Sequence, residues 1–178
     1  FQKFVKKEKT LSLEELDSCR KLCVEFKINS GASKKENTAY TMFSKAVLKS
    51  LPQICAEGKV LSLEELDSCR KLCVYFVMGL HKDGNTKVAF DAVKTVVTKS
   101  LSTICKKRKT LSLEDLQLCA ALCKDFGITA ESTEDAKKAH DAVESSIDNH
   151  IWQNLKNHNS PETSHFYLAS LVRALIDC

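Results

Sequence analysis

Apolar residues recur at steps of three and four along most of the chain, a spacing that places them on one face of an α-helix. One such stripe begins after residue 11, and we expect its members to face the core: Leu13, Leu16, Cys19, Leu22, Cys23 and Phe26. A second stripe lies between about residues 35 and 55 and consists of Tyr40, Phe43, Val47, Leu51 and Ile54. The pattern therefore predicts two helices joined by a short connection around Gly31.

This two-helix pattern repeats along the chain with a period of 50 residues. The segment Leu11–Val24 reads LSLEELDSCRKLCV and is identical to Leu61–Val74, while Leu111–Lys124 reads LSLEDLQLCAALCK at the same offset. A second block also recurs, because KSLPQIC ends at Cys55 and KSLSTIC ends at Cys105. Self-similarity at a fixed period indicates tandem copies of one structural unit.

We expect a single all-α repeat domain over residues 1–178, built from tandem helical hairpins. Its units cover about 10–58, 60–108 and 110–158, and a degenerate fourth copy at 160–178 supplies a capping helix, so that about seven helices are expected. One hairpin cannot bury its apolar face alone. We therefore expect the units to stack as a short solenoid or bundle.

The first helix of each unit carries a clear start signal. Ser12 followed by Glu15 forms a capping box, in which each side chain accepts a hydrogen bond from the other residue's backbone N–H. The same start signal recurs in Ser62 with Glu65, Ser112 with Asp115 and Ser132 with Asp135. Glycines suit the ends of helices, and we expect helix stops at Gly79, Gly84 and Gly127. These signals predict where each helix begins and ends.

Composition limits the classes of partner. The chain is 43% hydrophobic and 28% charged, as is ordinary for a globular protein. A net charge of +4 does not require a nucleic acid, and the basic runs at 6–9 and 106–109 have no counterpart in the second unit, so we interpret them as solvated turns. No apolar run approaches the roughly 18 residues of a membrane helix, so we expect no membrane span.

Nine cysteines stand at regular places in the repeat. They are Cys19, Cys23, Cys55, Cys69, Cys73, Cys105, Cys119, Cys123 and Cys178. This regularity favours a disulfide framework, which is typical of secreted proteins. Two alternatives are buried free thiols and, less favoured, a metal site.

Stacked units with parallel first helices would bring cysteines of neighbouring repeats to similar heights. On that geometry we expect the bridges Cys23–Cys69, Cys73–Cys119 and Cys55–Cys105, and more weakly Cys123–Cys178. Cys19 is left as the unpaired thiol. Bridges inside one hairpin are not expected, because Cys23 and Cys55 would lie on the order of 20 Å apart along the helix axis.

Catalytic and cofactor motifs are missing from the sequence. It has no nucleophile elbow, P-loop, HExxH or glycine-rich phosphate loop. The cysteines recur in every unit, whereas an active site is needed only once. His140, His150, His158 and His165 gather toward the C-terminus, and we interpret His140 as a core residue because it continues an apolar stripe. We expect no enzyme activity, no cofactor and no metal site.

These observations favour a secreted, non-enzymatic helical-repeat protein that binds a protein partner, of the effector, antigen or immune-modulator type. One alternative is a helical carrier of a lipid or another apolar ligand. Another is an intracellular scaffold with reduced thiols. The redox state of the cysteines separates the secreted alternatives from the intracellular one.

Overall fold

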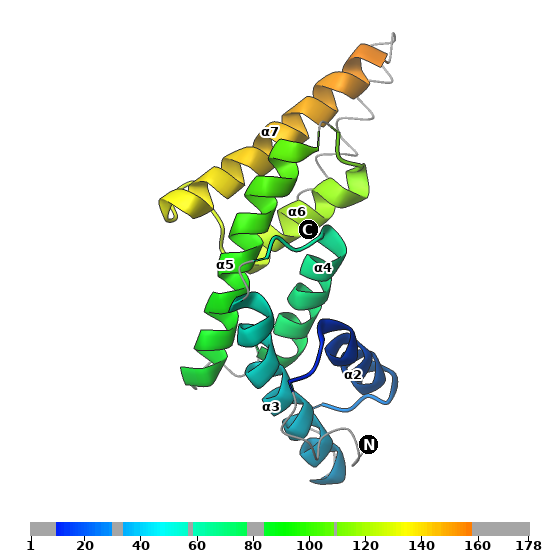
Figure 1. Ribbon diagram of the computed structural model, residues 1–178. Helices are drawn as coiled ribbons and strands as arrows, with labels where there is room; N and C mark the ends of the chain where they lie inside the picture. Colours follow the sequence, from blue (N-terminus) through cyan, green and yellow to red (C-terminus); the bar gives the residue numbers. More distant parts are fainter. Residues whose placement is uncertain (1–9, 30–33, 57–58, 78–83, 109, 158–178) are drawn as a thin grey trace. The chain divides into compact units, whose positions relative to one another are not determined.

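The computed structural model describes residues 10–29, 34–56, 59–77, 84–108 and 110–157, and every regular element in these ranges is helical (Figure 1). The elements are α2 (Leu13–Glu25), α3 (Lys34–Ala56), α4 (Leu63–Leu72), the π-helical turn η1 (Cys73–Val77), α5 (Gly84–Lys107), α6 (Leu113–Asp125) and α7 (Glu134–Asn157). The all-α prediction is confirmed. The predicted capping helix at 160–178 lies outside the described residues.

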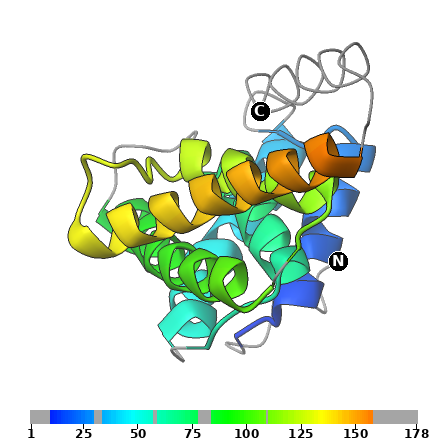
Figure 2. The same ribbon diagram turned by 90° about the horizontal axis from the view of Figure 1, so that it is seen from above.

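The chain packs as two compact units, and each is described by itself. The first comprises Phe1–Lys59 and Glu64–Val96. Within it, α2 packs along α3, and α3 also contacts η1 (Figure 1). The second unit comprises Val60–Leu63 and Val97–Cys178, and in it α7 lies against α6 (Figure 2). One repeat domain with stacked hairpins stays a prediction.

The predicted capping boxes start α2 and α6. The Glu15 backbone N–H donates to Ser12 Oγ at 3.2 Å, and the Ser12 N–H donates to Glu15 Oε2 at 2.8 Å. Ser112 and Asp115 make the same reciprocal pair in α6. Each box satisfies backbone donors that the first turn of a helix leaves without partners, which is why these helices begin where the sequence predicts.

The ends of these helices depend on one residue of the repeat. In α2, Lys27 has φ 53°, and the Ile28 N–H donates to the Cys23 carbonyl at 2.8 Å. In α6, Gly127 has φ 57° and Ile128 makes the equivalent bond. This is the Schellman ending, which needs a left-handed residue.

The second repeat has Val77 at the same position. A β-branched residue is strongly disfavoured in the left-handed region. There the helix does not close after α4 but continues as the π-helical turn η1, which includes Val77. The sequences of the two first helices are identical through Val24 and Val74 and then differ at Glu25 against Tyr75 and Lys27 against Val77, where the helices end in two ways.

Backbone-to-side-chain hydrogen bonds tie the start of each first helix to the second helix of the same hairpin. The Leu11 N–H donates to Ser50 Oγ at 3.1 Å, and the Leu61 N–H donates to Ser100 Oγ at 3.0 Å. In the third repeat the residue in place of serine is His150, whose Nδ1 lies 3.1 Å from the Leu111 carbonyl oxygen. The same tie between the two helices of a hairpin therefore recurs in all three repeats, with histidine in place of serine in the third.

Two predictions about local structure are wrong. Ser132 does not cap α7, which begins at Glu134; its hydroxyl accepts from the Thr129 N–H and donates to the Gly127 carbonyl, so it closes the preceding loop. Gly84 does not stop a helix but is the first residue of α5. Both errors arise because Ser and Gly suit loops and helix starts equally well.

Within the described ranges, no helix has both the length and the apolar character that crossing a bilayer requires.

Candidate functional site

The structure brings together cysteines from consecutive repeats, in pairs that differ from the predicted ones. Cys55 at the end of α3 is hydrogen-bonded to Cys69 in α4. Cys105 at the end of α5 is hydrogen-bonded to Cys119 in α6. The sequence analysis instead paired Cys55 with Cys105. The observed neighbours are separated by 14 residues in both copies.

The eight described cysteines are free thiols, so the structure gives the predicted disulfide framework no support. Cys178 lies outside the described residues. Cys23, Cys69, Cys73, Cys119 and Cys123 are buried, and Cys19, the predicted unpaired thiol, is half-buried. The bridges Cys23–Cys69, Cys73–Cys119, Cys55–Cys105 and Cys123–Cys178 stay predictions.

A sequence signal for the observed pairs was present. The second helix of one repeat is followed by only a short connection before the first helix of the next, so these two helices also form a hairpin. Cys55 and Cys69 lie near the closed end of that hairpin. The sequence analysis considered the hairpin inside one unit and the parallel stacking of first helices, but not the pairing of a second helix with the first helix of the next repeat, and therefore missed this juxtaposition.

The paired thiols differ in acidity. The hydrogen bond from Cys119 lowers the pKa of Cys105 to about 7, against the opposing effect of burial. A further hydrogen bond from Ser146 acts in the same direction, although the single Ser146 proton is shared with the Ala142 carbonyl 2.8 Å away. The pKa of Cys119 is raised, first by its hydrogen bond to Cys105 and then by burial. Cys105 is therefore the thiol of the pair that ionises first.

The thiol pair of the second repeat shows the same difference in acidity, to a smaller extent. The hydrogen bond from Cys69 lowers the pKa of Cys55, and the pKa of Cys69 is raised. Burial raises the pKa of Cys73, and likewise of Cys123, to about 12. In each copy the acidic thiol is thus the one at the end of the second helix.

Two cavities of the second unit open at Cys105. One has a volume of about 360 Å³, and its lining includes Lys106, Arg108, Ser146 and His150. The other, also about 360 Å³, shares Cys105 and Lys106 and adds Lys138 and Asp141. The lining of the first cavity is mainly polar, whereas that of the second is about equally polar and apolar. The first cavity therefore suits a charged ligand better than the apolar ligand of the carrier hypothesis.

A second feature is an exposed stripe on α2, formed by Cys19, Leu22 and Phe26, which we call the open face. Phe26 is 59% exposed, whereas its repeat counterparts Phe76 and Phe126 are 0% and 1% exposed. Leu22 and Cys19 are half-buried. Their counterparts are completely buried, namely Leu72, Leu122, Cys69 and Cys119. The prediction that Phe26 lies in the core is therefore wrong.

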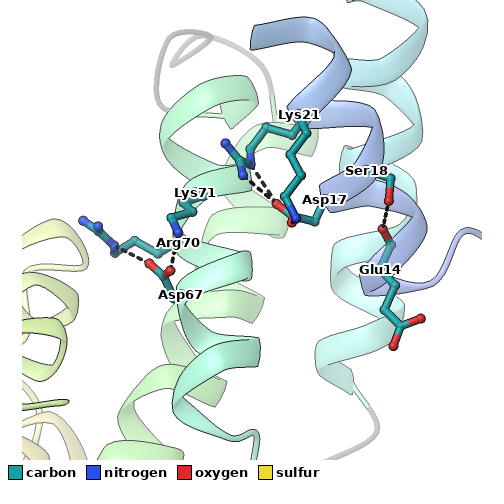
Figure 3. Close-up of polar contacts among 8 residues, drawn as sticks. Glu14, Asp17, Ser18, Lys21, Asp67, Arg70 and Lys71 are labelled. Atoms are coloured by element: carbon teal, nitrogen blue, oxygen red, sulfur yellow. Dashed lines mark hydrogen bonds and ion pairs between the residues drawn. The ribbon is translucent and has the colours of Figure 1, made fainter. Parts of the chain in front are cut away.

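The first two repeats also carry an ion-pair triad on their first helices, shown in Figure 3. Asp17 pairs with Arg20 at 2.8 Å and with Lys21 at 2.9 Å. Burial alone would raise the pKa of Asp17, but the hydrogen bonds from Lys21 and Arg20 outweigh it and lower the pKa. Asp67, Arg70 and Lys71 repeat the triad on α4. The third repeat has Gln117, Ala120 and Ala121 instead.

Ligand-forming groups also meet near the start of α7. His140 Nδ1 lies 3.8 Å from Asp141 Oδ1 and 3.7 Å from Glu144 Oε2. The His140 side chain is 24% exposed, so it is only partly a core residue, and both carboxylates are open to solvent. Exposed acidic groups are common without a metal, and we assign none here. His150 ties α7 to Leu111, while His158 and His165 lie outside the described residues.

Comparison with known proteins adds no assignment. No family model, curated protein or solved structure that was compared matches the chain. The functional argument therefore depends on the cysteine pairs, the cavities at Cys105 and the open face of α2.

Proposed function

We propose that this chain is a non-enzymatic helical-repeat protein that binds a protein partner through the open face of α2. The observation that carries the proposal is the exposure of Phe26, compared with the complete burial of Phe76 and Phe126. An exposed aromatic side chain on an apolar helix stripe is typical of a surface that receives another helix.

The second repeat supplies the template for what would cover this face. There α3, the second helix of the preceding repeat, packs on η1. Tyr40 of α3 stacks on Phe76 with ring centroids 5.4 Å apart, and its hydroxyl donates to the Tyr75 carbonyl at 3.0 Å. The equivalent residue of the first repeat, Phe26, is 59% exposed. We therefore expect the partner to present an amphipathic helix with an aromatic residue, as α3 does.

Additional contacts in the first unit show that this type of interface is specific as well as apolar. Tyr75 packs edge-on against Phe76 at 4.8 Å, and its hydroxyl donates to the Ile28 carbonyl at 2.6 Å. Buried hydroxyls with partners fix the register of a helix on its neighbour. A partner helix on α2 would need a comparable polar group beside its aromatic anchor.

A labelled peptide with the sequence of residues 34–56 provides a defined probe of the open face. We expect it to bind the full chain saturably in fluorescence anisotropy, and Phe26→Glu to abolish that binding. The matched control is Val88→Glu, because Val88 is also 59% exposed on a helix of the same unit. Circular dichroism of both variants checks that the helices are kept.

Two outcomes contradict the proposal. In one, the peptide does not bind the wild-type chain, or Phe26→Glu and Val88→Glu weaken peptide binding equally. In the other, sedimentation shows a wild-type dimer that Phe26→Glu dissociates, which would make a second copy of this chain the occupant. Neither outcome depends on the cysteines.

An extracellular location with disulfide bonds stays part of the proposal, and its support is the number and regular placement of the cysteines. Intact mass before and after alkylation without reductant, on protein taken from its natural source, tests the location. Nine alkylated thiols would favour the intracellular scaffold.

A further inference from the structure

We propose that Cys105 is a thiol–disulfide exchange site for an anionic, low-molecular-weight disulfide, and that Cys119 is the resolving thiol. The site is built from the cavity at Cys105, its two cationic side chains Lys106 and Arg108, and the neighbouring thiol of Cys119. These residues all belong to the second unit. The inference is independent of the open face of α2.

The cavities give the thiol an access route. Cys105 is only 8% exposed, yet it lines two cavities of about 360 Å³ each. Lys106 lines both of them, and Arg108 lines one, where its Nη1 is 3.4 Å from Asp115 Oδ2. Asp115 offsets part of the Arg108 charge, which leaves Lys106 as the main attraction for a carboxylate. The polar Asn149 and Gln153 complete a lining that suits a hydrated, charged ligand.

The exchange has two balanced steps. The Cys105 thiolate attacks one sulfur of the disulfide RSSR, the S–S bond breaks, and the products are Cys105–S–S–R and RS⁻. The Cys119 sulfur then attacks the Cys105 sulfur, the mixed S–S bond breaks, and the Cys105–Cys119 disulfide forms with release of the second RS⁻. The Cys119 proton ends on this thiolate, and the proton that Cys105 lost on ionising ends on the first RS⁻. Overall, two protein thiols are oxidised and one RSSR is reduced to two RSH.

Acidity and proximity support this order of events. The hydrogen bond from Cys119 lowers the pKa of Cys105, so a substantial thiolate fraction exists near neutral pH. Cys119 has a raised pKa and is completely buried, which makes it a poor first nucleophile. Its place next to Cys105 makes the second step intramolecular, which compensates for its weak ionisation.

The second repeat offers a matched internal control. Cys55 has the same thiol neighbour, Cys69, and a lowered pKa. The residues that follow it in sequence are Ala56 and Gly58, where the third repeat has Lys106 and Arg108. Val96 stands at the position of Ser146. A preference for anionic disulfides should therefore belong to Cys105 and not to Cys55.

Two reporter disulfides test the charge preference on the full chain: dithiobis-nitrobenzoate, which carries carboxylates, and neutral dithiodipyridine. We expect the anionic reagent to react with a fast phase that Cys105→Ser removes and Cys55→Ser leaves in place. Lys106→Ala should slow the anionic reagent several-fold and change the neutral one little. Lys124→Ala, at an exposed lysine of α6 that does not line the two cavities, should change neither.

Intact mass after reaction identifies the resolving thiol. In the wild type the reagent group should be displaced from Cys105, and peptide mapping should find the Cys105–Cys119 disulfide. In Cys119→Ser the mixed disulfide at Cys105 should persist, because the second step is blocked. Cys123→Ser should behave like the wild type.

The proposal is overturned if the fast phase survives Cys105→Ser, or if Lys106→Ala slows both reagents equally. It is also overturned if Cys123→Ser, rather than Cys119→Ser, traps the mixed disulfide. Circular dichroism of each variant separates loss of the site from loss of the fold.

Discussion

The first helices of repeats one and three begin with the same motif, start with the same capping box and end with the same Schellman geometry, yet their outer faces differ. Phe126 and Leu122 of α6 are buried, while Phe26 of α2 is 59% exposed. Cys119 has Cys105 beside it, whereas Cys19 is half-buried. The motif therefore determines the helix, and the neighbouring helix determines whether its face is core or surface.

The largest expected effect is on the stability of the buried aromatic position. Phe126→Ala should lower the free energy of unfolding by about 3–5 kcal/mol, because it leaves a cavity in a packed core. Phe26→Ala should change it by less than about 0.5 kcal/mol, as an exposed position does. Urea denaturation monitored by circular dichroism measures both. Similar losses for the two variants would mean that the open face is covered in solution.

Exchanging lysine and glycine at the left-handed residue should change the stability of the protein in opposite directions at the ends of α2 and α6. Lys27→Gly should stabilise the protein by about 1 kcal/mol, because a non-glycine residue is strained at φ 53°. Gly127→Lys should destabilise it by about the same amount, since Gly127 has φ 57°. Thermal melts of the two variants against the wild type give the comparison. Equal signs would show that the left-handed residue does not control these ends.

The capping boxes should be equivalent in the two repeats. Ser12→Ala and Ser112→Ala each remove the acceptor of one backbone N–H, and each should cost about 1 kcal/mol. Urea midpoints of the two variants should agree closely. A cost at only one serine would contradict the view that the motif acts the same way in every context.

The smallest effect concerns the triad that α2 has and α6 lacks. Asp17→Asn should cost about 0.5 kcal/mol near neutral pH. Because the folded pKa of Asp17 is lowered, the stabilisation is present above the unfolded value near 3.8 and is lost as the pH falls through the folded pKa. The stability gap between variant and wild type should therefore close in acid.

The control for this prediction lies in the third repeat. Gln117→Asp in α6 should bring no gain, because the positions of the two basic partners are Ala120 and Ala121. Urea melts from neutral pH downward measure both variants. If the difference in unfolding free energy between the wild type and Asp17→Asn grew in acid, the lowered pKa of Asp17 would be contradicted.

Much of the fold could be predicted from the sequence because its signals are local. The period of 50 residues, the apolar stripes and the boxes at Ser12 and Ser112 placed the helices closely. The π-helical turn that ends at Val77 was not predicted, although a β-branched residue at that position disfavours a left-handed helix ending. Ser132 was misplaced because loop closure and capping use the same hydroxyl chemistry.

The candidate sites were less predictable because they depend on which helices meet. The sequence analysis named the cysteines as candidate residues but did not predict the neighbours that the structure gives them, because it left out the hairpin formed across the short connection between repeats. The cavities at Cys105 require side chains from α5 and α7 together, which no local pattern encodes. The open face has the same stripe as its buried counterparts, so sequence alone could not distinguish them.

The most direct test of the central claim compares Cys19 with its counterparts Cys69 and Cys119 by site-resolved alkylation of the native protein with a neutral reagent. Burial and the Glu15 charge raise the pKa of Cys19, but it is half-buried, whereas Cys69 and Cys119 are completely buried. The account predicts that Cys19 is modified in the folded protein, while Cys69 and Cys119 are modified only as fast as the protein unfolds. Equal rates at all three positions would contradict it.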